Sequence, residues 1–263
     1  MKNNIIFPPV CQCLFTVFPV CRLRQKVLDG QPCESILLTM TIPEGTPAKG
    51  TAAAGRTVEG TPFYRLIRFA GTPLLNIFFR LRGEGLENIP AAGPFILAAN
   101  HVSYLDPLVL GATCPRPVHF IMLQEFWEKP VIGWIARKSG SFPVDQQGSA
   151  AGALRRALGV LRSGKVLGIF PEGGRSTDGS LQRGKGGAAL LVMKAGVPLL
   201  PAAIVGADRA LPKGRAFPRP ARIIVRYGRP ITVPPPSSPD QKREFLDTIT
   251  ARVMEAIGQL AKE

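Results

Sequence analysis

A histidine and an aspartate five residues apart form the first candidate for chemistry in this chain. His101, one of only two histidines, follows the apolar run Phe95–Ala99, and Asp106 stands directly before Pro107. The run predicts a buried strand that ends at His101, and the proline suits the start of a helix with Asp106 as its N-cap. A carboxylate bonded to one ring nitrogen fixes the imidazole tautomer and leaves the other nitrogen free to take a proton. No serine nucleophile accompanies the pair, so it predicts attack by a substrate hydroxyl.

A glycine-rich loop with an arginine is the second candidate. Residues 165–170 predict a short buried strand, which Pro171 and the following glycines end. Paired glycines let backbone N–H groups approach an anion, and Arg175 can bind a phosphate through two parallel hydrogen bonds. Ser176 adds a hydroxyl donor. Each stretch also has a purely structural interpretation: the first as a helix cap and the second as a surface turn. Neither stretch therefore decides the function by itself.

Taken together, the two stretches resemble the glycerolipid acyltransferase family. Four motifs in the family's order carry this resemblance, within about residues 63–227. They are residues 100–106 (Asn-His-x-x-x-x-Asp), 140–146, 170–176 (Phe-Pro-Glu-Gly-x-Arg-Ser) and 197–201 (Val-Pro-x-x-Pro). A short His-Asp pair is weak evidence by itself, but four ordered motifs are specific.

Two positions depart from the family pattern. The arginine that follows the aspartate of the second motif is Gln146 here, after Asp145, and the family's Lys-x-Glu aligns with Leu123, Gln124 and Glu125. In the family both positions are associated with holding the phosphate or shaping the acceptor site. Because glutamine carries no charge, a phosphate is expected to be held less tightly.

The resemblance implies an O-acyltransferase that moves a fatty acyl group to the free hydroxyl of 1-acylglycerol-3-phosphate, giving phosphatidic acid in phospholipid synthesis. The donor would be acyl-CoA or acyl carrier protein as a co-substrate, with no metal and no bound cofactor. His101 would be the general base and Asp106 its orienting group. The expected substrate-binding residues are Asn100, Ser103, Asp145, Gln146, Glu172, Gly173, Gly174, Arg175, Ser176 and Pro201. A lyso-ornithine lipid or a lysophospholipid is the alternative acceptor.

The charge of the chain favours an anionic partner. The formal net charge is +15, and residues 137–229 hold seventeen Lys and Arg against four Asp and Glu. Such a field concentrates lyso-lipid, acyl donor and anionic membrane near the protein. It would also attract nucleic acid, but no aromatic stacking motif accompanies it, so nucleic acid is not an expected partner.

Two other enzyme classes are disfavoured. Residues 179–186 almost form the phosphate-binding loop of nucleotide hydrolases, but Gly186 stands where that loop needs a Ser or Thr. No serine has the Gly-x-Ser-x-Gly surroundings of a serine lipase or esterase.

The chain divides into four expected regions: an extension and linker (1–60), amphipathic interfacial helices (61–90), an α/β core (91–233), and a proline spacer with a C-terminal helix (234–263). Alternating strand and helix patterns predict a single mixed, mostly parallel sheet flanked by helices. In residues 62–82, Gly71 and Pro73 are expected to separate two short helices. Their inserted face would include Phe63, Ile67, Phe78 and Leu81. This predicts a peripheral or monotopic protein on the cytoplasmic face of the cell membrane; an ordinary core-packing helix is the alternative.

Overall fold

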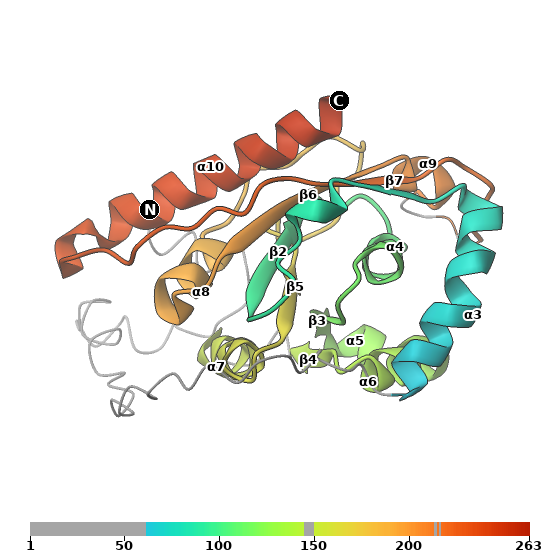
Figure 1. Cartoon of the computed structure of the whole chain (residues 1–263), viewed down its shortest axis with the longest axis horizontal. Helices are drawn as coiled ribbons and strands as arrows, with labels where there is room; N and C mark the ends of the chain where they lie inside the picture. Colours follow the sequence, from blue (N-terminus) through green and yellow to red (C-terminus); the bar gives the residue numbers. More distant parts are fainter. Residues whose placement is uncertain (1–61, 145–149, 213–214, 216) are drawn as a thin grey trace, which may run out of the picture.

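The computed structural model describes residues 62–144, 150–212, 215 and 217–263. Its centre is one seven-stranded sheet with the strand order β1-β7-β6-β2-β5-β3-β4 (Figure 1). The strands are β1 (Arg82–Glu84), β2 (Phe95–Ala99), β3 (Val118–Leu123), β4 (Phe142–Val144), β5 (Val166–Ile169), β6 (Leu199–Val205) and β7 (Ile224–Tyr227). Neighbouring strands of this sheet pair in parallel, apart from the antiparallel pair β6 and β7. The predicted mixed, mostly parallel sheet is confirmed.

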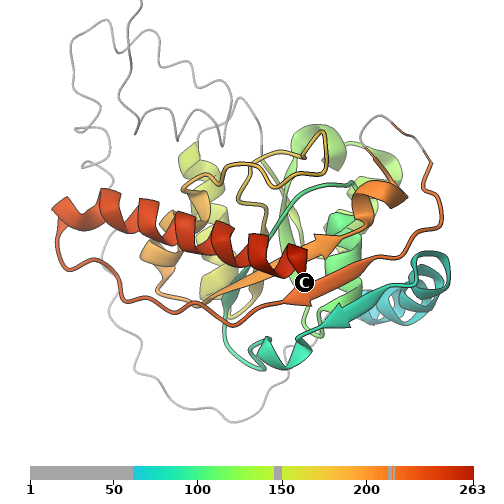
Figure 2. The same ribbon diagram turned by 90° about the horizontal axis from the view of Figure 1, so that it is seen from above.

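Helices cover both faces of the sheet. They are α3 (Pro62–Phe79), α4 (Asp106–Thr113), α5 (Gln124–Trp127), α6 (Pro130–Lys138), α7 (Ala150–Arg162), α8 (Gly187–Ala195), α9 (Ala207–Ala210) and α10 (Lys242–Lys262), with the short 3-10 turns η2 (Leu86–Asn88) and η3 (Pro239–Gln241). Figure 2 shows α10 running along the sheet, where it contacts β6 and β7.

The central strand β2 divides the core into two layers, because successive side chains of a strand point to opposite faces. Phe95 and Leu97 pack in one cluster with Val109 of α4. Ile96 and Ala98 pack in the other, where α7, α8 and α10 contribute Leu158, Leu191 and Val253, among others. All five β2 residues are completely buried, as a strand covered on both faces requires.

Three local predictions were wrong. Residues 62–79 form one helix with Pro73 inside it, not two helices. Leu75 and Phe79 pack against the core, and this packing outweighs the backbone hydrogen bond that the proline removes. The helical periodicity of residues 126–138 predicts one helix, but the structure divides this stretch between α5 and α6, and α6 begins at Pro130. Leu81, expected on an inserted apolar face, is buried in the core.

The order of the strands brings the two candidate stretches to one edge. β2 lies between β5 and β6, and Ala98 pairs with Ile169 of β5 and Pro201 of β6. Because these three strands are parallel, their carboxyl ends meet at the same edge, which is where ligands bind in open α/β sheets. His101 follows β2 and Arg175 follows β5 at this edge.

Candidate active site

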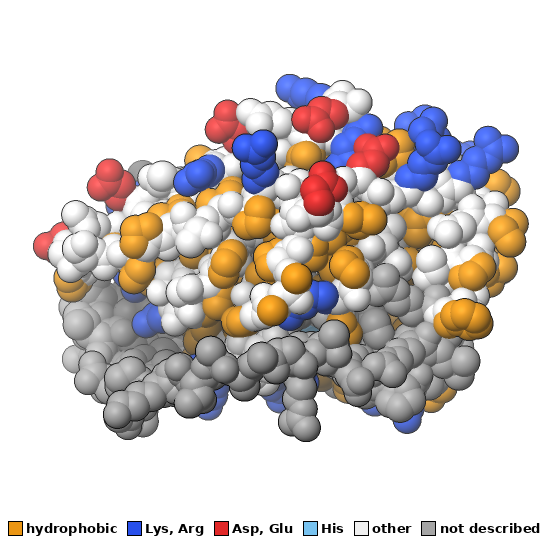
Figure 3. All heavy atoms as spheres, in the orientation of Figure 1, with side chains coloured by type: hydrophobic (Ala, Val, Ile, Leu, Met, Phe, Trp, Pro, Cys, Tyr) orange, Lys and Arg blue, Asp and Glu red, His pale blue; other side chains and the backbone are white. Residues whose placement is uncertain are grey.

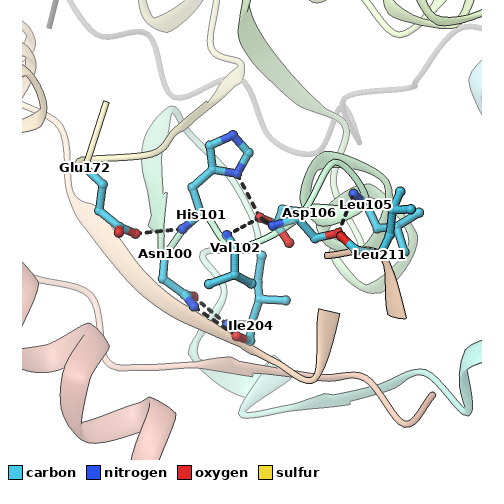
Figure 4. A network of polar contacts seen from close by, with 9 residues as sticks. Asn100, His101, Val102, Leu105, Asp106, Glu172, Ile204 and Leu211 are labelled. Carbon is cyan, nitrogen blue, oxygen red and sulfur yellow. Dashed lines mark hydrogen bonds and ion pairs between the residues drawn. The ribbon is translucent and has the colours of Figure 1, made fainter. Parts of the chain in front are cut away.

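The imidazole of His101 and the carboxylate of Asp106 are in direct contact. Nδ1 of His101 lies 2.8 Å from Oδ2 of Asp106 (Figure 4). The histidine side chain is 18% exposed, whereas the aspartate side chain is completely buried. In Figure 4 the far edge of the imidazole points away from Asp106. A carboxylate in this place keeps the proton on Nδ1, so Nε2 can accept one from a substrate.

A tight turn after β2 returns the carboxylate to the histidine. Oδ2 of Asp106 also accepts hydrogen bonds from the backbone N–H groups of Val102 at 2.7 Å and Ser103 at 2.8 Å. The prediction that Asp106 is a helix N-cap was wrong: α4 begins at Asp106 itself, with Leu105 in the cap position. The carboxylate binds the turn that precedes the helix because those N–H groups and the imidazole converge on it.

Burial raises the pKa of the Asp106 carboxyl, and the hydrogen bond and charge of His101 and the two backbone N–H groups oppose that rise. Oδ1 of Asp106 is buried without a hydrogen-bond partner among the described residues. The ionised form of this carboxylate therefore depends on the few donors that face Oδ2, chiefly His101.

Glu172 joins the two candidate loops. Its Oε1 accepts the backbone N–H of His101 at 2.7 Å, and its Oε2 accepts the backbone N–H of Gln182 at 2.9 Å. Ser176 donates its backbone N–H to the carbonyl oxygen of His101 at 2.8 Å. Both backbone groups of His101 are thus bonded to the loop after β5. Burial raises the pKa of Glu172, and the two backbone donors oppose that rise.

The side chain of Arg175 lies over an aromatic ring of the turn between His101 and Asp106. Its Cζ is 3.4 Å from the centroid of the Tyr104 ring. Nη1 of Arg175 is buried and has no hydrogen-bond partner among the described residues. The planar guanidinium in this state retains a donor for an anion such as phosphate.

The loop after β5 needs glycine at one position. Gly173 has φ +65°, and a Cβ there would lie 2.7 Å from Nζ of Lys185. The lysine backbone N–H also bonds to the carbonyl oxygen of Pro171 at 2.8 Å, so this cation lies against the loop. Burial lowers the pKa of Lys185. Gly174, by contrast, has open space where its Cβ would be.

Two other predicted substrate-binding side chains are bonded to backbone. The Asn100 amide donates to the carbonyl oxygen of Ile204 at 2.9 Å and accepts its N–H at 2.7 Å, which links β2 to β6. The Ser103 hydroxyl donates to the carbonyl oxygen of Leu211 at 2.9 Å. Substrate contact by Asn100 and Ser103 stays a prediction, but their places in the structure show that they shape the turn.

The remaining predicted residues differ in where they lie. Pro201 is buried within β6, and its ring lies beside Gly228, so the structure does not bring it together with the His101 and Arg175 loops. Ser176 donates from its hydroxyl to Asp178 at 2.9 Å. Asp145 and Gln146 lie outside the described residues.

Sequence reasoning missed the aromatic contacts of the site. The Phe170 ring stacks on the His101 ring with centroids 4.0 Å apart and planes 14° from parallel. Tyr104 lies under Arg175. Both aromatic residues stand inside motifs, but a motif position does not show which ring a side chain will meet.

Comparisons with known proteins identify relatives of this chain. A family model described as Acyltransferase matches residues 80–205. The chain is 32% identical over 138 residues to a 1-acyl-sn-glycerol-3-phosphate acyltransferase of Bacillus subtilis, a match over 50% of this chain and 68% of that protein. It is 33% identical over 140 residues to a chloroplastic 1-acyl-sn-glycerol-3-phosphate acyltransferase of Arabidopsis thaliana, but covers only 39% of that relative's length.

A solved structure shares the fold. The crystal structure of the 1-acyl-sn-glycerophosphate (LPA) acyltransferase of Thermotoga maritima superposes with a TM-score of 0.61 and 30% sequence identity, over 73% of this chain and 78% of that one. The four motifs, the sheet that carries them and these relatives give one answer: the chain belongs to the glycerolipid acyltransferase family, among relatives of the 1-acyl-sn-glycerol-3-phosphate acyltransferase type.

Proposed function

We propose that this protein transfers a fatty acyl group from acyl-CoA or acyl carrier protein to the free hydroxyl of 1-acylglycerol-3-phosphate, forming phosphatidic acid for phospholipid synthesis. One observation carries the proposal: the loop that holds the His101–Asp106 pair is hydrogen-bonded to the loop that holds Arg175. A base beside an arginine suits an acceptor that has a hydroxyl close to a phosphate. The relatives named for this activity support the same acceptor.

In the proposed reaction, Nε2 of His101 removes the proton of the acceptor hydroxyl as that oxygen attacks the thioester carbonyl carbon. The tetrahedral intermediate then expels the thiolate, and the imidazolium gives its proton to that thiolate. Asp106 stabilises the imidazolium and keeps the ring in place during both steps. We propose that neither a metal nor a bound cofactor takes part, because this pair supplies both proton transfers.

Arg175 is the proposed anchor for the acceptor phosphate. An arginine binds a phosphate through paired, charge-assisted hydrogen bonds, and Lys185 adds a second positive charge against the same loop. Fixing the phosphate places the hydroxyl near His101 and removes part of the entropic barrier to transfer.

We also propose that the protein binds the cytoplasmic face of the cell membrane peripherally. Within the described residues, no helix has both the length and the apolar character needed to cross a bilayer. Helix α3 exposes Phe69, Leu74 and Ile77, of which the first and last are 83% and 82% exposed. Figure 3 shows hydrophobic side chains along the edge that α3 forms at the right of the view. Such a surface suits contact with a lipid layer.

A basic segment continues this surface. Ile223 donates its backbone N–H to the carbonyl oxygen of Phe79, so the segment before β7 lies at the end of α3. It carries Phe217, which is 84% exposed. A groove in the same region is lined by Arg209, Arg219, Arg222 and Arg226. Apolar side chains beside several arginines favour a membrane that contains anionic lipid.

The proposed activity is tested by assaying the purified chain on a panel of lyso-lipids, with acyl-CoA and with acyl carrier protein as donors. We expect 1-acylglycerol-3-phosphate to give the highest kcat/KM, and His101→Ala to abolish transfer. A clear preference for a lyso-ornithine lipid or a phosphate-free acceptor would replace the proposed acceptor with that one.

Vesicle flotation tests the membrane proposal. We expect binding to vesicles of phosphatidylcholine and phosphatidylglycerol, and weaker binding after Phe69→Ser with Ile77→Ser or after Arg219→Gln with Arg222→Gln. The control removes two exposed arginines of α10, Arg243→Gln with Arg252→Gln. Equal losses in the control and in the Arg219 and Arg222 variant would show a response to net charge alone.

A further inference from the structure

We propose that Tyr104 is a positioning residue for the acceptor phosphate, acting through Arg175. The inference rests on the proposed function, because it gives Arg175 a phosphate to bind. Its basis is the contact between the guanidinium and the tyrosine ring, whose centroid lies 3.4 Å from Cζ. Nothing in the sequence motifs assigns a role to Tyr104.

The short distance defines how the two groups lie. A separation this close to van der Waals contact requires the guanidinium to lie flat over the ring, because an edge-on approach would place Cζ farther away. The N–H donors of arginine point outward in the guanidinium plane, so stacking covers one face and leaves the donors along the edge. The ring therefore orients Arg175 without using the hydrogen bonds that a phosphate needs.

One donor of Arg175 is left for a ligand. Nη1 is shielded from solvent and has no hydrogen-bond partner among the described residues. A buried donor without an acceptor is unfavourable, and a phosphate oxygen would satisfy it. The ring contact holds the side chain in this unsatisfied position when no acceptor is bound.

Tyr104 is itself fixed by its neighbours. It stands in the turn between His101 and Asp106, and the Asp106 carboxylate binds two backbone N–H groups of that turn. On another side, the Phe126 ring meets the Tyr104 ring edge-on, with centroids 5.3 Å apart and planes at 63°. The ring thus belongs to the element that carries the base, and it contacts the side chain proposed to carry the phosphate.

This arrangement fixes the proposed phosphate-binding side chain relative to the proposed base. The backbone already joins the loops, since Ser176 donates to the carbonyl oxygen of His101. Tyr104 adds a side-chain link one residue away, at Arg175. Its expected contribution is to acceptor binding and not to the proton transfers of His101.

The experiment compares Tyr104→Leu with Tyr104→Phe in the full chain, using detergent-dispersed acceptors. Leucine fills part of the space but removes the aromatic face, whereas phenylalanine keeps the face and loses only the hydroxyl. We expect Tyr104→Leu to raise KM for 1-acylglycerol-3-phosphate by about 3- to 10-fold with little change in kcat. KM for a phosphate-free monoacylglycerol should change little, and Tyr104→Phe should behave like the wild type on both acceptors.

A double variant shows whether Tyr104 acts through Arg175. If it does, Tyr104→Leu should add no further rise in KM once Arg175→Ala is present. Additive effects, an equal loss on both acceptors, or a Tyr104→Phe variant as impaired as Tyr104→Leu would each overturn the inference. If Arg175→Ala itself does not discriminate between the two acceptors, the proposed phosphate anchor fails, and that result is separate from the Tyr104 comparison.

Discussion

The two loops of the site differ in how their polar groups are satisfied. In the turn after β2, the carboxylate of Asp106 is completely buried and receives three donors on one oxygen. In the loop after β5, Gly173 and Gly174 are exposed, and Arg175 has a ring contact, but its Nη1 has no partner in the part of the chain that the structure describes. In the first loop, Oδ2 of Asp106 is satisfied by donors of the protein, whereas the second loop leaves a guanidinium donor for the proposed ligand.

This difference separates two tasks. A base needs fixed geometry before the substrate arrives, and the network around Asp106 provides it. A binding loop needs unsatisfied donors, which cost stability until a ligand accepts them. Changes to His101 and Asp106 should therefore reduce kcat. Changes to the second loop, or to the Tyr104 ring that contacts Arg175, should mainly raise KM for the acceptor.

The largest effect is expected in the first loop. His101→Ala should lower kcat by at least about 10²-fold, because no other group replaces the base. Asp106→Asn should also be severe, since an amide does not stabilise the imidazolium. Circular dichroism and acceptor binding should stay close to wild type for both, and wild-type turnover by a folded His101→Ala protein would refute the mechanism.

The same aspartate gives a stability prediction with a definite sign. Burial raises the pKa of the Asp106 carboxyl in the folded state above its value in the unfolded chain. The protonated carboxyl therefore contributes to the stability of the folded state at low pH. This contribution is lost as pH rises through the folded-state pKa. Asp106→Asn removes this titration. The free energy of unfolding of the variant, relative to wild type, should therefore increase as pH rises through that range. A relative stability that falls with pH would contradict the assignment of burial as the main cause.

The second largest effect concerns Arg175. Arg175→Ala should weaken binding of 1-acylglycerol-3-phosphate by about 1.5–3 kcal/mol, the range for a hydrogen bond to a charged group. KM for a phosphate-free acceptor should change far less. Arg183→Ala is the control, because Arg183 is an exposed cation of the same region. Equal losses on both acceptors would make Arg175 a structural residue.

Substitutions at two neighbouring glycines test how far the loop depends on the backbone conformation at each position. Gly173→Ala should destabilise the protein by about 1–2 kcal/mol, because a side chain at φ +65° is strained. It should also displace Lys185 and raise KM for the acceptor. Gly174→Ala should leave the free energy of unfolding nearly unchanged, since its Cβ would meet open space. Chemical denaturation of the two variants measures the difference.

The sequence predicted those parts of the fold that depend on local pattern. Residues 150–162 have helical periodicity, and α7 spans these residues. Strands β2 and β5 agree with their apolar runs, since strands covered on both faces are apolar throughout. The contact of His101 with Asp106 also follows from a local turn of five residues.

Contacts between distant segments could not be predicted in the same way. Glu172 bonds to the backbone of His101 across 71 residues, and Asn100 bonds to Ile204 across 104. Short edge strands such as β1 also escaped prediction, because a glycine between two charged residues has no periodicity to detect. Motifs identified which residues matter, but only the folded sheet shows whether each faces a ligand or the backbone.

The smallest expected effect tests whether the binding loop acts with a second charged partner. Gln146, which lies outside the described residues, stands where the family has an arginine. If the acceptor is 1-acylglycerol-3-phosphate, Gln146→Arg should lower KM or leave it unchanged, because a second guanidinium could bind the dianionic phosphate. If the natural acceptor has a bulkier or less charged headgroup, the same change should slow the native reaction and improve activity on 1-acylglycerol-3-phosphate. Assays of both proteins on the lyso-lipid panel separate these cases.

A wild type that already prefers 1-acylglycerol-3-phosphate and does not respond to Gln146→Arg would mean that position 146 does not contact the phosphate. The Arg175 loop would then suffice to hold it.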